Sequence, residues 1–228
     1  MTVRKWFKGL MIGAVALTAA CAQLEDAPEP TTRNLIDHAV FTINEFRANP
    51  KLKPFAHHLA EARAVVVLPS VLKAGFFAGG EGGNGVLVAR DANGVWGQPA
   101  FYTLAAASIG VQFGVQDTAI VLIIRNDGAL KSIMNHQGKI GGDTGISIGL
   151  HGIGKEASTT TNMGADIVAF ASSNLGAYLG ASLEGAVLVV RNDLNTAFYG
   201  KDVTPESIIA GRSTDPRTER LRSVLGGG

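Results

Sequence analysis

The spacing of apolar residues predicts two helices near the start of the chain. In the first, the apolar residues recur at three- and four-residue intervals: Leu35, Ile36, Ala39, Val40, Ile43 and Phe46. Such spacing places them on one face of a helix, with Thr32 as a candidate N-cap and Pro50 as the end. A second, shorter helix is predicted from Pro54 to Arg63.

From Ala64 onward the pattern changes to that of strands and glycine turns. A β-branched run over residues 65–68 is expected to end at Pro69. Three later segments alternate apolar residues with small or polar ones, at residues 109–116, 145–151 and 175–184. Strands with one apolar face are typical of antiparallel sheets or barrels. Short helices are predicted near residues 129–134 and 205–209.

The chain contains an internal repeat. Residues 109–127 align without gaps to residues 175–193, and seven of the 19 positions are identical, including the terminal Arg-Asn-Asp. Each copy is expected to form an alternating strand, a turn and an apolar strand that ends at arginine. Because no linker-like stretch separates the copies, we predict a single α+β domain. Its core would be a mainly antiparallel β-sheet or partly open barrel with N-terminal helices and an internally repeated hairpin.

The first 21 residues are typical of an export signal. Basic residues among the first eight precede an uncharged apolar run from Gly9 to Ala20. As a helix, that run reaches only about 18 Å, short of the roughly 30 Å of a bilayer's hydrocarbon core. Ala19 and Ala20 before the single cysteine, Cys21, resemble the lipobox of bacterial lipoproteins.

This resemblance predicts a lipoprotein signal peptide over residues 1–20, covalent acyl chains at Cys21, and a Pro-rich acidic tether over residues 21–32. Ala22 in place of Asp predicts sorting to the outer membrane of a bacterial cell envelope, facing the periplasm. The alternative is an ordinary cleavable signal, in which Cys21 has no role.

Composition and charge exclude several classes. Of 228 residues 46% are hydrophobic, too many for a disordered chain, and one cysteine excludes a disulfide framework. Beyond the first twenty residues, 17 basic and 19 acidic residues give a net charge of −2. Such a balance argues against nucleic acid as the main partner. The polar, Arg-rich tail over residues 212–228 is predicted to be disordered.

Three motifs resemble catalytic or nucleotide-binding signatures without fitting them. Residues 80–85 match G-x-G-x-x-G, but a strand pattern follows, so a Gly-rich hairpin turn is expected. Residues 149–155 approach a P-loop, but Glu156 replaces the Mg²⁺-binding hydroxyl. Ser147 lies in G-x-S-x-G with His151 nearby, which leaves a serine hydrolase as a weak alternative.

No metal or cofactor site is expected either. His57 and His58 are adjacent on a predicted helix, so they point about 100° apart and cannot bind one ion together.

Glycines and strand-end cations are the remaining candidates for a site. Six glycines fall at i, i+4 on the three alternating strands: Gly110, Gly114, Gly145, Gly149, Gly176 and Gly180. They could form a groove for an acyl chain, although packing of the N-terminal helices or coiling of the sheet is favoured. Basic residues near predicted turns, at Lys73, Arg90, Arg125 and Arg191, are candidates for binding anionic headgroups.

A series of longer motifs, which follow one another in a fixed order along the chain, resembles a known family. The segments over residues 65–76, 79–90, 96–102, 108–116, 120–125, 187–193 and 198–200 resemble SYLF domains. The resemblance covers about residues 33–211. It implies a non-catalytic lipid-binding module, since eukaryotic members bind phosphoinositides and help to regulate actin at membranes. For this chain it implies binding of anionic phospholipid or phosphoinositide-like headgroups, with the four basic residues above as candidates. The alternative is an outer-membrane structural or adaptor lipoprotein whose protein partner is unknown.

Overall fold

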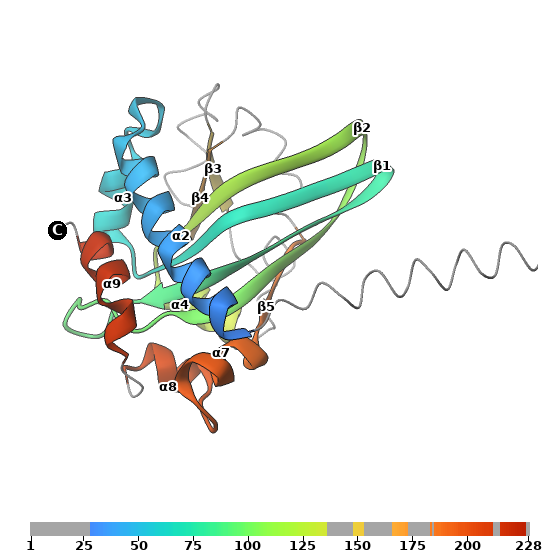
Figure 1. Ribbon diagram of the computed structural model, residues 1–228. Coiled ribbons are helices and arrows are strands. Elements are labelled where there is room, and N and C mark those ends of the chain that lie inside the picture. Colours follow the sequence, from blue (N-terminus) through green and yellow to red (C-terminus); the bar gives the residue numbers. More distant parts are fainter. Residues whose placement is uncertain are drawn as a thin grey trace, which may run out of the picture.

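The computed structural model describes residues 28–135, 148–152, 166–172, 183, 185–211 and 215–226 (Figure 1). The elements in chain order are α2 (Pro28–Ala48), the 3₁₀-helix η1 (Pro50–Leu52), α3 (Phe55–Glu61), β1 (Ala64–Ala89), β2 (Ala100–Ile124), α4 (Asp127–Asn135), β3 (Ile148–Gly152), β4 (Ile167–Ala171), β5 (Val187–Val190), α7 (Asn192–Tyr199), α8 (Pro205–Ile209), the 3₁₀-helix η3 (Pro216–Thr218) and α9 (Glu219–Gly226). The predicted α+β class with an open, mainly antiparallel sheet and N-terminal helices is confirmed.

The sheet is organised around β2. β1 pairs antiparallel with β2 along nearly its whole length, from Ala64 opposite Ile124 to Leu87 opposite Ala100. The last residues of β2 also pair with β4, and residues near its start pair with β5. β3 adds to β4 in parallel, which gives the order β1-β2-β4-β3 with β5 on the other part of β2.

The long β1–β2 ribbon doubles back on itself, as Figure 1 shows. The two ends of β1 meet, because the Arg90 amide donates a hydrogen bond to the Arg63 carbonyl at 2.9 Å. Where the halves of β1 cross, a Cβ on Gly83 would lie 2.2 Å from the Ser70 carbonyl oxygen. A Cβ on Gly85 would lie 2.3 Å from the Val67 carbonyl oxygen. Only glycine fits such contacts.

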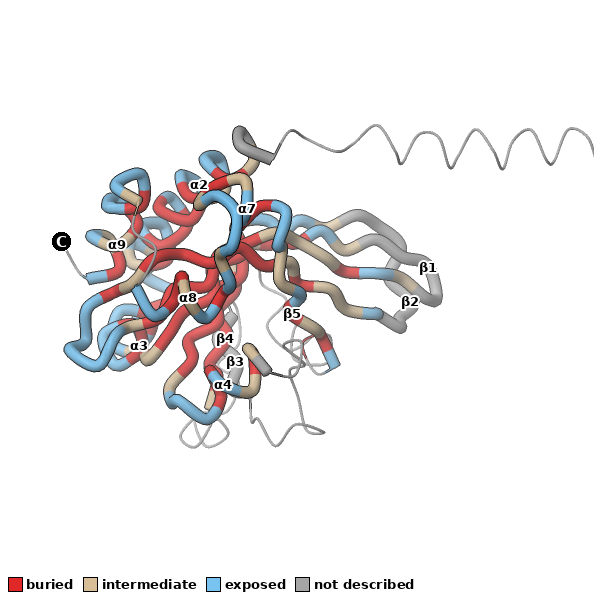
Figure 2. Tube along the Cα trace, turned by 90° about the horizontal axis from the view of Figure 1, so that it is seen from below, coloured by how far each residue is buried: buried red, intermediate tan, exposed pale blue. Residues whose placement is uncertain are grey.

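The sheet is buried on both faces, because alternate residues of β1 enter two different cores. Val65 and Val67 pack with Phe46, Phe55 and Phe170 against the helices. Val66 and Leu68 face the other core, which takes in residues of α4 and α8. Figure 2 shows α2, α7 and α9 on one side of the buried strands and α4 on the other.

Three local predictions in the β region are wrong. Pro69 does not end the first strand, because a register shift between Leu68 and Val71 accommodates it. The segment over residues 80–85 is not a turn; it lies inside β1, where two of its glycines permit the crossing. The first copy of the repeat is not a hairpin, and residues 175–182 of the second copy lie outside the described residues. β2 runs unbroken to Ile124. The first Arg-Asn-Asp ends at Asp127, where α4 begins, and the second contains Asn192, where α7 begins.

Both ends of the domain are more ordered than predicted. The tether was expected to run to residue 32, but α2 begins at Pro28 and Thr32 is fully buried. The tail was expected to be disordered, but η3 and α9 occupy residues 216–226. Leu221 and Leu225 are one helical turn apart, and their burial against α2 stabilises α9. Residues 1–27 lie outside the described part.

Replacing Gly85 by alanine tests the crossing of β1. The added methyl group meets a backbone oxygen at 2.3 Å and Leu68 Cδ2 at 2.8 Å, so the strand must move. We expect the free energy of unfolding to fall by about 3 kcal/mol in urea titrations. Gly80→Ala is the control in the same strand, since nothing lies within 4 Å of its Cβ. It should leave stability unchanged or raise it by up to about 1 kcal/mol; equal losses in the two variants would contradict the close approach.

Candidate ligand-binding pocket

The structure does not bring the four predicted basic residues together. Arg90 and Arg125 lie at one end of the sheet, on either side of Arg63. The Arg63 amide donates to the Ile124 carbonyl, and the Arg63 carbonyl accepts from the Arg90 amide. Arg90 has structural contacts there: its guanidinium carbon lies 4.6 Å from the centre of the Trp96 ring, and its Nη2 donates to the Leu59 carbonyl.

Lys73 and Arg191 are also engaged in contacts, elsewhere in the sheet. Lys73 Nζ lies 3.9 Å from Glu81 Oε2, and the two side chains are 16% and 5% exposed. Arg191 holds Asp193 in a fork, with nitrogen–oxygen distances of 2.9 and 2.7 Å, and its Nη1 donates to Asn84. These contacts give Lys73 and Arg191 structural partners in parts of the sheet other than the end at which Arg90 and Arg125 lie.

The glycine groove receives no support from the described strands. Gly110 and Gly114 lie in β2 opposite Phe77 and Gly75 of β1. Gly149 lies in β3, and β4 lies between β3 and β2 in the sheet. β4 pairs with β2 over residues 120–124, beyond Gly110 and Gly114. The three therefore form no continuous strip. Gly145, Gly176 and Gly180 lie outside the described residues.

The candidate hydrolase residues are not tested. Ser147 lies outside the described residues, and His151 is described only as part of the β3 backbone. Within the described ranges, no group of three His, Cys, Asp or Glu side chains is placed to hold a metal ion. In the same part of the chain, no helix is long and apolar enough to cross a membrane.

A pocket of about 270 Å³ lies where α2, α7 and η3 meet. Arg33, Ile36 and Asp37 of α2 line it, together with Phe198 of α7 and Arg217 of η3. The position of the pocket follows from the local sequence. Because Ile36 lies on the buried stripe of α2, Asp37 and the preceding helical turn lie at the edge of the helix. The lining combines apolar surface with cations and one carboxylate.

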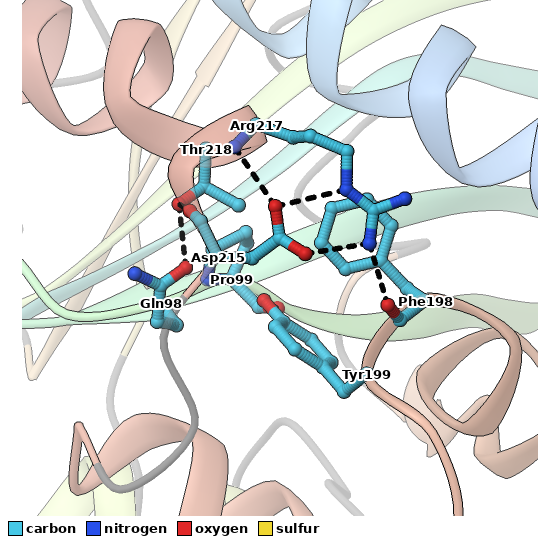
Figure 3. A network of polar contacts seen from close by, with 7 residues as sticks. All are labelled: Gln98, Pro99, Phe198, Tyr199, Asp215, Arg217 and Thr218. Atoms are coloured by element: carbon cyan, nitrogen blue, oxygen red, sulfur yellow. Dashed lines mark hydrogen bonds and ion pairs between the residues drawn. The ribbon is translucent and has the colours of Figure 1, made fainter.

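Arg217 is held rigidly at this pocket (Figure 3). Its Nε and Nη2 donate to the two Asp215 oxygens at 2.8 and 2.5 Å, and Nη2 also donates to the Phe198 carbonyl at 2.7 Å. The guanidinium carbon lies 3.9 Å from the centre of the Phe198 ring. Because several contacts fix it at once, the guanidinium is held in one position in the wall of the pocket.

Further polar contacts fasten the same corner to the β1–β2 loop. Thr218 Oγ1 donates to Gln98 Oε1 at 2.5 Å, and the Tyr199 hydroxyl donates to the Pro99 carbonyl at 2.7 Å (Figure 3). Burial raises the pKa of Tyr199 well above its ordinary value, so it remains a donor. The network therefore joins η3, α7 and the loop into one unit.

The electrostatics of the pocket centre on two carboxylates. The hydrogen bonds from Arg217 hold the pKa of Asp215 below its usual value, and the nearby charge of Arg33 lowers it further. Asp37 lies four residues from Arg33 on α2, so the two are neighbours on the helix surface. In the described part of the chain, the side chains of Arg33 and Asp37 form no hydrogen bond and no close ion pair. Such a lining suits an anionic group with a hydrogen-bond donor beside it.

The residues of this pocket were missed because Arg33 fell at the expected domain boundary and Arg217 in the expected disordered tail. A usable signal was present in the sequence. Asp215 followed by Pro216 is a helix-start signature, and its carboxylate does accept from the Arg217 amide. Leu221 and Leu225 then repeat at helical spacing, which indicates a packed C-terminal helix.

Comparison with known proteins identifies the family. The profile of the Ysc84 family, described as "Las17-binding protein actin regulator", matches residues 105–227. Protein YSC84 of Saccharomyces cerevisiae is 33% identical over 183 residues, or 79% of this chain and 38% of that protein. SH3 domain-containing YSC84-like protein 1 of Homo sapiens is 30% identical over 172 residues, or 75% of this chain and 50% of that protein.

The chain belongs to the Ysc84, or SYLF, family. LAS seventeen-binding protein 3 of S. cerevisiae is also similar, at 32% identity over 173 residues, which is 75% of this chain and 37% of that protein. In each comparison the matched segment spans half or less of the relative's length.

Several residues that carry the SYLF resemblance have structural roles. Trp96 lies under α9, with its ring 4.0 Å from a Cβ placed on Gly226. Gln98 and Pro99 accept the hydrogen bonds from Thr218 and Tyr199 described above. The Trp-Gly-Gln-Pro segment of this SYLF domain thus contacts α7, η3 and α9 and holds these C-terminal helices in place.

Asp215→Asn tests whether the Arg217 fork stabilises this corner. Because the Arg217 side chain is 35% exposed, solvent screens the pair and we expect a loss of only about 1 kcal/mol. Asp215 has a lowered pKa in the folded state, so its contribution is present above the ordinary pKa of about 3.9 and disappears as pH falls through the folded value. Urea unfolding at descending pH should therefore show wild type and variant converging in acid.

Asp202→Asn is the matched control for that experiment. Asp202 is exposed and has φ 65°, a conformation that asparagine adopts readily. Its substitution should leave stability unchanged at all pH values. A gap between wild type and Asp215→Asn that persists in acid would contradict the role of the fork.

Proposed function

We propose that the protein is a lipid-anchored protein of the bacterial cell envelope whose SYLF domain binds anionic phospholipid and catalyses no reaction. In this proposal Cys21 carries the acyl chains, and the domain faces the periplasm from the outer membrane. More than one acyl chain at the same cysteine would make the attachment stable.

The observation that carries the proposal is the position of the pocket with its two arginines. It lies at the N-terminal end of α2, which is the end where the chain leads back to Cys21. Residues 21–27 span at most about 25 Å when fully extended. An anchor at Cys21 would hold the pocket close to the bilayer surface, where a guanidinium attracts anionic lipid.

The lining of the pocket supports binding rather than chemistry. Its five residues include no serine, cysteine, lysine or histidine, so a nucleophile with an adjacent base is lacking among them. Asp37 and the two arginines recognise charge and donate or accept hydrogen bonds. The relatives are likewise named for binding or regulation.

A second candidate function is that of a membrane-anchored adaptor. The printed name of LAS seventeen-binding protein 3 describes a protein that binds another protein. By analogy, the SYLF domain of this chain would hold a protein partner, and the acyl anchor would supply all of its affinity for the membrane.

Vesicle flotation of unacylated residues 22–228 separates the two functions, because this segment keeps every described element. We expect it to float with vesicles that contain phosphatidylglycerol in phosphatidylcholine, and not with phosphatidylcholine alone. Added salt should weaken the binding, because at 0.1 M salt the interaction between exposed charges is largely screened beyond about 10 Å. Absence of binding to either vesicle would overturn the lipid proposal and favour the adaptor.

The anchor is tested separately in the full-length chain. Wild type should fractionate with membranes, and its mature form should carry the mass of acyl chains on Cys21. Cys21→Ser should remove that mass. A mature wild-type chain without added mass would contradict lipidation, whatever the result of flotation.

A further inference from the structure

We propose that the pocket between α2, α7 and η3 takes the headgroup of a single phospholipid. Arg33 and Arg217 would contact its phosphate, and Asp37 would accept a hydrogen bond from a hydroxyl or ammonium group of the same headgroup. The inference rests on the proposed lipid function and adds the part of the lipid that is recognised and the residues that select it.

The size of the pocket matches a headgroup. At about 270 Å³ it is slightly smaller than the roughly 300–1,000 Å³ of pockets for drug-sized ligands. The apolar part of the lining, Ile36 and Phe198, suits the few carbon atoms that link a phosphate to its polar substituent.

The two arginines contribute differently. Arg217 is fixed by Asp215, by the Phe198 carbonyl and by the Phe198 ring, so its charge is largely balanced by the carboxylate behind it. Arg33 is exposed on the first turns of α2, and Asp215 feels its charge only as a nearby cation. Arg33 therefore supplies most of the attraction for a phosphate, while Arg217, whose Nε and Nη2 already donate to Asp215 and the Phe198 carbonyl, provides a rigid wall.

Asp37 limits which anions fit. A carboxylate in the lining repels a simple anion, and that repulsion is removed when the ligand brings a donor to it. Phosphatidylglycerol has hydroxyl groups at this position, and phosphatidylserine has an ammonium group. An anionic lipid with only a methyl group beyond its phosphate leaves Asp37 unsatisfied.

The test compares phosphatidylglycerol with phosphatidylmethanol, which has the same charge but no donor. Flotation of residues 22–228 is measured for wild type, Arg33→Gln and Asp37→Asn. The control is Lys131→Gln, which removes one exposed positive charge from α4 on the opposite side of the sheet. All three substitutions are at exposed or helix-surface positions, and equal urea midpoints will show that the variants are folded.

Wild type should prefer phosphatidylglycerol. Arg33→Gln should weaken partitioning to it about fivefold, the effect of one cation close to an anionic surface, and Lys131→Gln less than about twofold. Asp37→Asn should improve binding to phosphatidylmethanol and reduce or abolish the preference for phosphatidylglycerol. This change of preference is not expected from a purely structural role of Asp37.

Failure of this inference differs from failure of the proposed function. If wild type binds neither anionic vesicle, the lipid function itself is overturned. If wild type binds but Arg33→Gln equals Lys131→Gln, or Asp37→Asn changes both lipids equally, the pocket assignment is overturned and lipid binding stands. Soluble sn-glycerol 3-phosphate should bind wild type more weakly than vesicles do; equal or tighter binding would make a free phosphate ester the ligand and overturn the headgroup assignment.

Discussion

The close crossing of the two halves of β1 is the constraint on which the rest of the domain depends. A carbonyl oxygen of the first half lies where a side chain of Gly85 would be, and Gly83 meets the same strand in the same way. This approach brings Ala64 and Ala89 side by side and folds β2 with them. As a result, β4 and β5 attach to different parts of one strand, and α2, α7 and α9 cover one face of the sheet while α4 lies on the other.

The helical layer depends on this curvature. Val65, Val67 and Val88 come from both halves of β1, yet they enter the same core as the buried stripe of α2. α9 and the end of α7 then pack along α2, held by the contacts of Thr218 and Tyr199 with the β1–β2 loop. The pocket with Arg33 and Arg217 is a product of that packing, because its walls come from three elements far apart in the sequence.

The sequence predicted α2, α3, α4 and α8 well because each buries a regular apolar stripe. It also predicted the sheet class, since the alternating segment that begins at residue 109 does lie in a strand, β2. It failed at Gly80–Gly85, because a glycine run reports backbone freedom without saying whether the cause is a turn or a crossing strand. Strand ends likewise predicted the positions of Arg90 and Arg191, but not all of their contacts, because the Leu59 carbonyl and Asn84 come from distant parts of the chain. Arg33 and Arg217 meet only through tertiary packing, so no local pattern could pair them.

The contact between α2 and α9 joins the first and the last described helices. Leu221 and Leu225 complete the core that α2 begins, and the Arg47 guanidinium donates to the Leu225 carbonyl. During synthesis, α2 leaves the ribosome long before α9, so the part of its apolar stripe that Leu221 and Leu225 cover stays exposed until α9 has been made. A domain built in this way completes its helical layer only after residues 219–226 have emerged.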